Sequence, residues 1–314
     1  MSAKTAALRS AAGRKRRDWT PLGYLSPALF SIALLSLVPV CWSIYVAFTN
    51  YSMLHFKNYE FVGLDNFRQL LSGPLKSLFF PLLGWNLAFA LLTTGCMFGL
   101  GLFLALILNN PHIKEAPLYR TLLIIPWAMP GTITILVWKG MFNESFGPVN
   151  VFLRELGFKG LPFLSNPFWA RVVVILVSTW FGFPYFMSLT SGALQAINHE
   201  LYDAVAVDGG NAWVRFRHVS WPGIWSVVAP LLITSFSYNF NNFGIAYLIT
   251  NGGPFRLNTQ YAGYTDILAS FGYKLTQNFQ LYGLASAMGI ILFFIVAVLS
   301  IYQIKLMAKE GGLS

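Results

Sequence analysis

Residues 77–113, SLFFPLLGWNLAFALLTTGCMFGLGLFLALILNNPHI, form an apolar stretch that contains no Asp, Glu, Lys or Arg. A helix that crosses the hydrocarbon core of a bilayer needs about 20 apolar residues, so this stretch is long enough to span a membrane. Buried core helices of large soluble proteins rarely run this far without a charge. The stretch therefore predicts a membrane-spanning helix.

Other charge-free windows meet the same length criterion. They are residues 19–56, 121–138, 172–199, 218–254 and 275–304. The composition agrees, because 56% of the 314 residues are hydrophobic and only 10% are charged, against roughly 25% charged in an ordinary soluble domain. We therefore expect an all-α, polytopic membrane protein with six transmembrane helices.

The orientation follows from the basic N-terminal tail. An even number of spans puts both termini on one side, and the tail carries Lys4, Arg9, Arg14, Lys15, Arg16 and Arg17. The positive-inside rule then predicts that both termini are cytoplasmic. The run from Pro27 to Phe48 is too long for a signal peptide and has no obvious cleavage site, so it predicts an uncleaved first helix. We divide the chain into a basic cytoplasmic tail (1–22), a transmembrane domain (23–309) and a C-terminal tail (310–314).

Charge and cysteine content exclude some classes of protein. The net charge of +10 comes from basic residues that flank the predicted spans, so lipid headgroups explain it and no nucleic-acid partner is expected. Cys41 and Cys96 both lie inside predicted spans, and no Cys-x-x-Cys pattern occurs. We expect inert thiols and no metal site.

The fifth predicted span carries polar side chains at helical spacing. Ser235, Tyr238, Asn239 and Asn242 follow i, i+3, i+4 and i+7, which is one face of a continuous helix. Amides are costly in a bilayer and suit sugar hydroxyls, while an aromatic ring suits the apolar face of a pyranose. Helix packing is the alternative explanation. We expect this face to bind a carbohydrate.

The fourth predicted span repeats this pattern. Ser178, Gly182 and Tyr185 follow i, i+4 and i+7, with Thr179 and Phe181 beside them. Gly182 is expected to leave space for a ligand. Small and hydroxylated residues also pack between transmembrane helices, so the residues of this span favour a ligand site and helix packing equally.

A longer cytoplasmic segment, residues 194–223, is expected between these two spans. Asn198 predicts a helix N-cap, and Gly209 with Gly210 predicts a sharp turn between two short helices. The segment is either an amphipathic interfacial loop or an element that docks on another protein.

Within this segment, residues 201–222 (LYDAVAVDGGNAWVRFRHVSWP) resemble the EAA loop of binding-protein-dependent ABC importers. The pattern of an acidic residue, Ala, Asp-Gly and a downstream Pro is matched by Asp203, Ala204, Asp208, Gly209 and Pro222. Three residues differ from the usual ones: Asp203 is acidic but stands where Glu is usual, and Val205 and Gly210 stand where Ala is usual. In that family the loop fits a cleft on the ATPase subunit. The resemblance therefore implies a coupling role for Asp203, Ala204, Asp208, Gly209 and Gly210.

Residues 235–243, 250–254 and 262–266 (SFSYNFNNF, TNGGP and AGYTD) resemble the larger permease subunit of maltose/maltodextrin transporters. The resemblance implies a type I ABC importer permease fold in a prokaryotic cell membrane. It also implies a second permease subunit, an ATPase dimer that holds ATP and Mg, and an extracytoplasmic sugar-binding protein as partners. Residues 50–79 leave no room for the folded external domain that some relatives insert there.

The same resemblance adds Trp127 and Gly131, on the third span beside Pro126 and Pro130, to the expected sugar site. This chain departs from the family where Trp127 stands in place of Tyr, and where Ser178 and Thr179 stand in place of two Asn. These departures predict an altered sugar preference. Maltose, longer maltodextrins and trehalose all fit.

We therefore expect a permease subunit that moves maltose/maltodextrin-type α-glucosides and holds no cofactor. An ion-coupled secondary carrier or a membrane enzyme is the rival hypothesis, but such carriers commonly bury ionisable relays, and the charge-free windows offer none. No set of catalytic residues can be assembled, and no Gly-x-x-x-x-Gly-Lys-Ser/Thr loop occurs. ATP hydrolysis is expected in a separate subunit.

Overall fold

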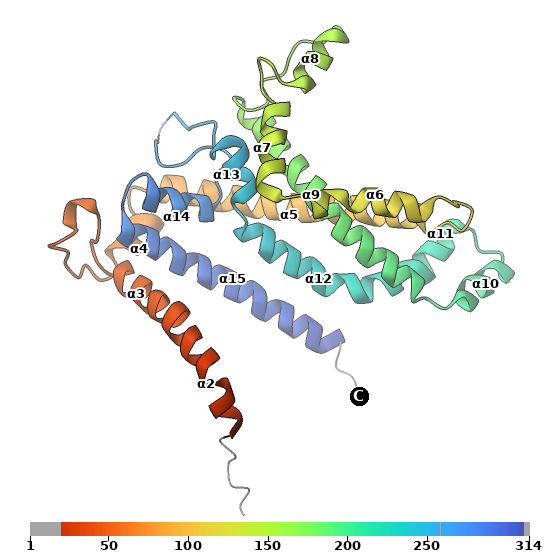
Figure 1. Cartoon of the computed structure of the whole chain (residues 1–314), viewed down its shortest axis with the longest axis horizontal. Coiled ribbons are helices and arrows are strands. Elements are labelled where there is room, and N and C mark those ends of the chain that lie inside the picture. The colour runs from red at the N-terminus through yellow and green to blue at the C-terminus, as the bar shows by residue number, and fades with distance from the viewer. Residues whose placement is uncertain (1–19, 258, 311–314) are drawn as a thin grey trace, which may run out of the picture.

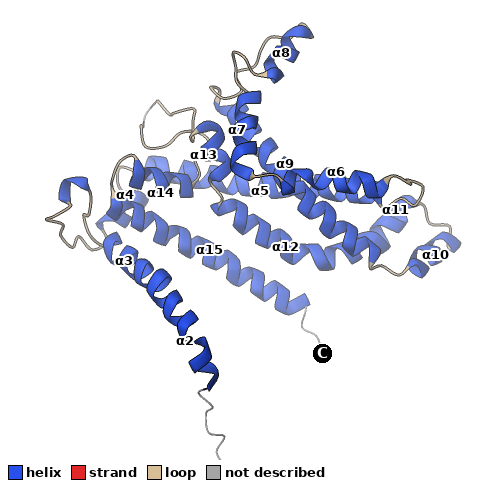
Figure 2. Ribbon diagram, viewed as in Figure 1, coloured by secondary structure: helices blue, strands red, loops and turns tan. Residues whose placement is uncertain are grey.

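A computed structural model describes residues 20–257 and 259–310, and within these ranges helices joined by turns and loops make up the structure, with two isolated β-bridges (Figures 1 and 2). The helices are α2 (Thr20–Ile32), α3 (Val38–Ala47), α4 (Asp65–Leu71), α5 (Lys76–Leu108), α6 (Ala116–Ala128), α7 (Gly131–Met141), α8 (Pro148–Glu155), α9 (Pro167–Gln195), α10 (His199–Val207), α11 (Ala212–Arg215), α12 (Trp221–Asn241), α13 (Gly244–Thr250), α14 (Leu268–Gln277) and α15 (Tyr282–Glu310). Short π-helical segments, Ala33–Leu37 and Phe216–Ser220, join α2 to α3 and α11 to α12, and a 3-10 turn covers Met53–His55. The all-α prediction is confirmed.

The helical segments that are long and apolar enough to cross a membrane match the predicted windows. They are Gly23–Ala47, Lys76–Leu108, Pro167–Gln195, Ala212–Asn241 and Tyr282–Tyr302. A sixth is reached when α6 and α7 count as one span, although these helices meet at 94°. The basic tail residues up to Arg17 and residues 311–314 lie outside the described residues.

The third predicted span is therefore not the straight helix that residues 121–138 suggest. Its break falls at Met129, which has an extended backbone with φ −79° and ψ 147°. Pro130 follows, and a proline disfavours the helical conformation of the residue before it. The span therefore bends sharply at Met129 and Pro130, whereas Pro126 lies inside α6.

The fifth predicted span, within the window 218–254, is also interrupted, which corrects the expectation of one continuous helix. Helix α12 ends at Asn241, Asn242 is extended with φ −85° and ψ 93°, and α13 starts at Gly244. Asn242 consequently does not continue the helix face formed by Ser235, Tyr238 and Asn239. Beyond α13, Asn251 adopts the left-handed conformation with φ 53°, and the chain turns as the Asn-Gly-Gly-Pro sequence predicts.

Helices α5 and α9 form the central pair of the structure and lie side by side (Figure 1). Their backbones approach closely at Gly101, where an added Cβ would lie 2.7 Å from the backbone nitrogen of Met187. Glycine at this crossing permits the close contact, as is common between transmembrane helices. Helix α12 packs on α5, and α15 packs on α12 and α3.

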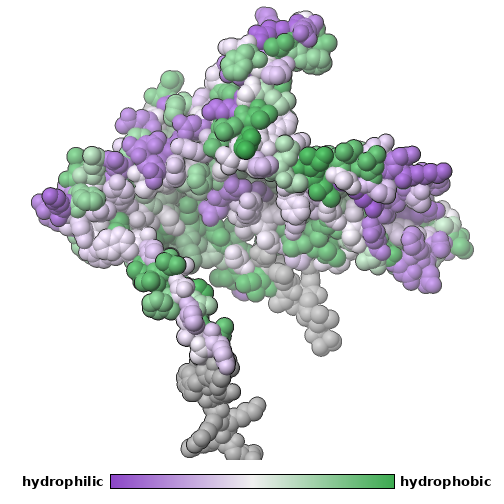
Figure 3. All heavy atoms as spheres, viewed as in Figure 1, coloured by the Kyte–Doolittle hydropathy of each residue, from purple (hydrophilic) through white to green (hydrophobic). Residues whose placement is uncertain are grey.

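The first helical segment contributes little to this bundle. Every residue from Gly23 to Tyr45 is exposed, and the segment leaves the bundle at its α3 end (Figure 1). Hydrophobic side chains gather on the surface of α3 (Figure 3). Such a surface is suited to lipid or to another transmembrane helix.

Candidate functional site

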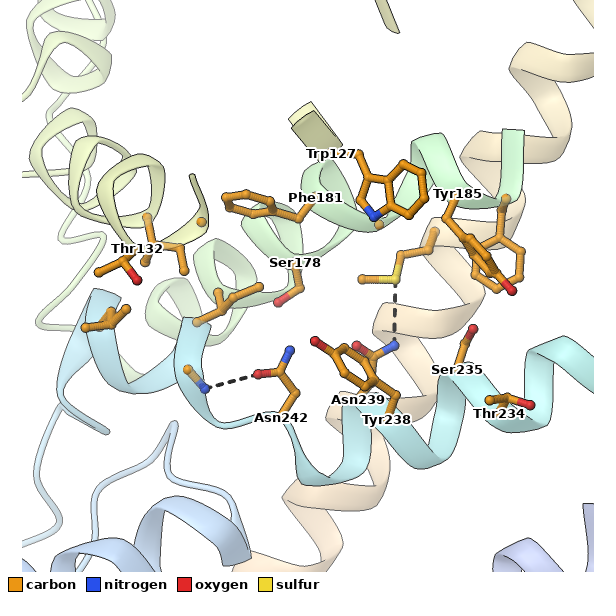
Figure 4. Close-up of a pocket in the computed structure, with 18 residues that line it drawn as sticks. Trp127, Thr132, Ser178, Phe181, Tyr185, Thr234, Ser235, Tyr238, Asn239 and Asn242 are labelled. Carbon is orange, nitrogen blue, oxygen red and sulfur yellow. Dashed lines mark hydrogen bonds between the residues drawn. The ribbon is translucent and has the colours of Figure 1, made fainter. Parts of the chain in front are cut away.

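A cavity of about 570 Å³ lies where the breaks in α6–α7 and α12–α13 meet helix α9 (Figure 4). Its lining comprises Met97 of α5, Trp127 of α6, Gly131, Thr132 and Ile135 of α7, Ser178, Phe181, Gly182, Tyr185 and Phe186 of α9, Thr234, Ser235, Tyr238 and Asn239 of α12, Asn242 at the break, and Gly244, Ile245 and Leu248 of α13. The cavity thus brings together side chains that lie far apart in the sequence.

All the residues predicted to bind sugar line this cavity, with the exception of Thr179. The Thr179 hydroxyl is buried and has no hydrogen-bond partner among the described residues. The structure therefore groups the predicted residues in one place. Their contact with a sugar stays a prediction.

Asn242 reaches the cavity because the backbone is broken there. Its Oδ1 accepts a hydrogen bond from the backbone N–H of Gly244 at 3.3 Å. The Nδ2 group of Asn242 points into the space below Ser178 (Figure 4). Since an amide nitrogen only donates, Asn242 offers a hydrogen-bond donor to a ligand.

Asn239 offers a ligand a hydrogen-bond acceptor, whereas Asn242 offers a donor. Its Nδ2 donates to Thr94 Oγ1 at 3.0 Å and to Met97 Sδ at 3.6 Å, so both N–H groups are directed at α5. The side chain is 4% exposed. Only Oδ1 remains for a ligand, and Asn239 therefore offers an acceptor. Part of its role is interhelical, as the packing alternative anticipates.

Aromatic rings form the more open part of the cavity. Trp127 and Tyr238 are 62% and 67% exposed, and the rings of Trp127 and Tyr185 lie 6.3 Å apart with an angle of 52° between their planes. Phe181 covers the side toward α7 (Figure 4). These rings provide apolar faces, and the tyrosines also carry hydroxyls that are able to donate or accept.

Ser178 is a buried polar group without a protein partner. The residue is 1% exposed, and its hydroxyl has no hydrogen-bond partner within the described part of the chain. Its oxygen faces Asn242 across the cavity (Figure 4). An unpaired buried hydroxyl costs about 1–3 kcal/mol. A hydroxylated ligand would remove this cost.

Gly182 was expected to leave space for a ligand because it has no side chain. The structure corrects this expectation, since the space beside Gly182 is filled. A Cβ at this position would overlap Sδ, Cε and Cγ of Met97. The close packing of α5 against α9 fills the space with the methionine side chain. Gly182 still lines the cavity, but through its backbone.

Several lining residues were missed from the sequence. Met97, Thr132, Phe186 and the α13 residues Ile245 and Leu248 belong to this group. Thr132 follows Gly131, which was predicted to bind sugar, so its place in the sequence could have indicated that it lines the cavity. Met97 lies in the apolar window 77–113, where nothing in the sequence distinguishes one face of the helix from another.

The segment of residues 194–223, which is expected to be cytoplasmic, forms a projection built from α10 and α11 (Figure 1). Asn198 caps α10, since its Oδ1 accepts from Glu200 N at 3.1 Å, as predicted. Gly209 has φ +74°, a conformation that favours glycine. Gly210 has no room for a side chain, because a Cβ there would overlap the side chain of Val205. Tyr202 Oη and Ser220 Oγ, 2.9 Å apart, join α10 to the segment before α12.

The predicted coupling residues lie on the surface of this projection. Asp203, Ala204 and Asp208 are exposed. The apolar side chains of Leu201, Val207 and Trp213 are 53%, 88% and 63% exposed. Apolar side chains of this size on a short surface helix are suited to contact with another protein.

The opposite end of the bundle contains a buried ion pair. Lys274 Nζ of α14 lies 2.7 Å from Asp266 Oδ2, with the side chains 2% and 0% exposed. The carboxylate also accepts from Gly263 N and Ser270 Oγ, both at 2.7 Å. These bonds compensate part of the desolvation cost of the charges and hold the segment before α14 in one conformation.

The carboxylate of Glu144 contributes to the order of the segment between α7 and α9, together with Asn150. Glu144 Oε1 accepts from Leu164 N at 3.1 Å and from Ser165 N at 2.7 Å. Burial raises the pKa of Glu144, but the hydrogen bonds from Ser165 and Leu164 outweigh it and leave the pKa below its usual value. Among the described residues, no group of three or more His, Cys, Asp or Glu is placed to hold a metal ion.

Comparisons with known proteins agree with this architecture. Residues 97–307, more than half of the chain, match the family described as "Binding-protein-dependent transport system inner membrane component". Over 284 residues the chain is 37% identical to the galactooligosaccharides transport system permease protein GanP of Bacillus subtilis (strain 168), covering 89% of this chain and 68% of GanP. It is also 37% identical over 298 residues to the maltodextrin transport system permease protein MalC of Streptococcus pneumoniae (TIGR4), covering 91% and 68%.

A third relative is longer. The chain is 39% identical over 249 residues to the maltose/maltodextrin transport system permease protein MalF of Vibrio parahaemolyticus, covering 78% of this chain and 48% of that protein. The chain thus spans about half of MalF. Among solved structures, a bacterial ABC transporter involved in the import of the acidic polysaccharide alginate matches with a TM-score of 0.76 at 21% identity, covering 94% of this chain and 96% of the other. That likeness shows a shared fold.

Proposed function

The chain belongs to the inner-membrane components of binding-protein-dependent transport systems, and on this premise we propose that its cavity binds a maltose- or maltodextrin-type α-glucoside on its way into the cell. The family and the curated relatives make it a multi-pass permease for sugars of the ABC importer type. The choice of α-glucoside is the further step that the proposal takes.

One observation carries the proposal. The cavity combines a donor on Asn242, an acceptor on Asn239 and the unpaired hydroxyl of Ser178 with exposed aromatic rings. Its lining side chains carry no formal charge at neutral pH, which favours a neutral ligand because an ion would be costly to desolvate there. A sugar ring with alternating hydroxyls and C–H faces fits both kinds of group. The volume falls within the range typical of small-molecule sites, about 300–1,000 Å³.

Galactooligosaccharides are the second candidate, because GanP is as similar to this chain as MalC is. Trehalose remains a third candidate. All three are neutral, hydroxyl-rich ligands, so the common features of the cavity suit each of them. The position of Ser178 and Trp127, which depart from the maltose-type pattern, makes these two residues the candidates for selectivity.

The cytoplasmic projection supports the mechanism of an ATP-driven importer. In the proposed complex, α10 docks on an ATPase subunit through exposed Asp203, Ala204 and Asp208 beside the Gly209 turn. The ATPase dimer holds ATP and Mg, a second permease completes the pathway, and an extracytoplasmic binding protein delivers the sugar. Movement of α10 then changes access to the cavity by rigid displacement of packed helices.

The test compares three asparagines in reconstituted complexes. Asn242→Ala removes a ligand-facing donor, so KM for uptake should rise about three- to tenfold, corresponding to about 0.5–1.5 kcal/mol for one hydrogen bond. Asn241→Ala, one residue away and exposed, serves as the matched control and should leave KM unchanged. Asn239→Ala should raise KM and also lower the melting temperature, because it removes the bond to Thr94.

Uptake should be measured with a panel of maltose, maltotriose, trehalose and a galactooligosaccharide. Preference for the α-1,4-linked glucosides supports the proposed substrate class, and preference for galactosides replaces it with the second candidate. A lower melting temperature of Asn242→Ala with unchanged sugar dependence would mean that the residue only packs, and the site assignment would then be wrong.

A further inference from the structure

The break between α12 and α13 separates two backbone groups that a continuous helix would join. In an α-helix the carbonyl of Phe240 would accept from the N–H of Gly244, four residues later. Here the Phe240 oxygen accepts instead from Asn86 Nδ2 at 2.9 Å, and the Gly244 N–H donates to Asn242 Oδ1 at 3.3 Å. Two side-chain amides, from Asn86 and Asn242, thus replace one backbone hydrogen bond.

Asn86 uses both halves of its amide. It lies on α5 with 0% exposure, and its Oδ1 accepts from Leu268 N, the first residue of α14, at 2.9 Å. One buried side chain therefore ties α5 to the break in the fifth span and to the start of α14. Its partners lie 154 and 182 residues away in the sequence.

We propose that Asn86 is a positioning residue for the cavity, because it keeps the α12–α13 break open. With Phe240 O satisfied by Asn86, Gly244 N remains directed at Asn242 Oδ1, and Asn242 keeps its Nδ2 group for the ligand. The same bond holds α13 where Ile245 and Leu248 form a wall of the cavity. Asn86 does not line the cavity and acts on the ligand only through these residues.

Loss of the Asn86 amide favours closing of the break. The buried Phe240 oxygen would then be unpaired, and Gly244 N is the donor that a regular helix supplies to it. Re-forming that bond takes Gly244 away from Asn242 Oδ1 and moves the α13 wall. The fixed donor of Asn242 and the shape of the cavity would change together.

The link to α14 extends this effect to the opposite end of the bundle. Leu268 follows directly on the segment that Asp266 and Lys274 hold in place. Asn86 is one of the links between that segment and the break, beside the contact of Thr250 Oγ1 of α13 with Thr265 Oγ1 at 2.6 Å. The cavity and the segment before α14 are in this way joined by hydrogen bonds as well as by the packing of Ala246 and Phe243 with Ile267.

The experiment rests on the proposed uptake function and measures KM, maximal rate and melting temperature in reconstituted complexes. Asn86→Leu removes both hydrogen bonds at similar volume. Asn86→Ser is the milder variant, because a serine hydroxyl in a helix is able to bond to the carbonyl of its own preceding turn. Thr93→Val is the matched control, since Thr93 is fully buried on the same helix and its hydroxyl has no partner in the described structure.

Both Asn86 variants should raise KM about three- to tenfold, and Thr93→Val should not. The double variant Asn86→Leu with Asn242→Ala should raise KM no further than the larger single change, because both residues act on one break. If Asn86→Leu does not assemble, Asn86→Ser carries the same comparison.

Either of two results would overturn the inference. One is that the Asn86 variants that assemble keep the KM of the parental protein. The other is that the fold-changes in KM caused by the Asn86 and Asn242 substitutions multiply in the double variant. Failure of the proposed function is a separate result. In that case Asn242→Ala itself leaves KM unchanged for every sugar of the panel.

Discussion

Gly182 of α9 lies against the thioether of Met97 of α5, so closely that a side chain at position 182 would overlap it. Both residues line the cavity, and Met97 Sδ also accepts a hydrogen bond from Asn239. The packing of the central helix pair and the shape of the cavity therefore depend on the same contact.

Replacing Gly182 by alanine should push Met97 away from α9. Overpacking of this kind typically costs about 1–3 kcal/mol, so the melting temperature of the complex should fall and KM for uptake should rise. Gly192→Ala on the same helix is the control, because a Cβ there meets nothing within 4 Å. Equal behaviour of the two variants would contradict this explanation. The double variant Gly182→Ala with Met97→Ala should lose less stability than the sum of the two single changes, because the two residues are in contact.

The turn after α10 is expected to tolerate asparagine but not valine at position 209. The φ of +74° at Gly209 is strongly disfavoured for a β-branched residue, whereas asparagine adopts the left-handed region more easily. Gly209→Val should abolish transport and sugar-stimulated ATP hydrolysis while the amount of subunit in the membrane stays normal. Gly209→Asn should retain most of both activities. Normal stimulated hydrolysis by the valine variant would show that the turn does not couple the subunits.

The loop held by Glu144 should lose order in acid. Its pKa is lowered in the folded loop, so the carboxylate stabilises the loop fully above the ordinary glutamate value of 4.5, and this contribution is lost as the pH falls through the lowered value. Hydrogen exchange at Leu164 and Ser165, corrected for the intrinsic rate, should therefore accelerate below about pH 4.5. Glu144→Gln, which cannot ionise, should show no such transition. Protection that stays constant from pH 7 to 3 in the parental protein would refute the prediction.

Both termini should lie in the cytoplasm. A cysteine at Ser314, in a background with Cys41→Ser and Cys96→Ser, should react with an impermeant maleimide only after spheroplasts are permeabilised. Phe146→Cys is the positive control, because Phe146 is 70% exposed in the loop expected outside the cell, and it should react in intact spheroplasts. Labelling of the terminal cysteine in intact spheroplasts would reverse the orientation.

The helices and most of the cavity were predictable because their signals are local in the sequence. Charge-free windows give the membrane-spanning segments, and Pro130 gives the bend in the third span. The cap at Asn198 and the turn at Gly209 likewise follow from the residue types at those positions. Residue spacing along α9 and α12 is enough to predict most of the polar side chains that these helices contribute to the cavity.

The break at Asn242 was not predictable in this way. No proline interrupts residues 231–249, and the break is stabilised by Asn86, which belongs to a different helix. Gly182 and Met97 show the same limit, since the space beside a glycine depends on which residue of the neighbouring helix faces it. Signals that depend on a distant partner are absent from a single helical window.

The close approach of α5 and α9 at Gly101 has a mechanical consequence. Two helices whose backbones are in contact resist bending relative to each other and move as one rigid body. Helix α10 begins four residues after Gln195, the last residue of α9, and about 15 Å of α9 separates Tyr185 from that end at 1.5 Å per residue. A tilt applied at the end of α9 would thus reach the cavity with α5 and α9 moving together.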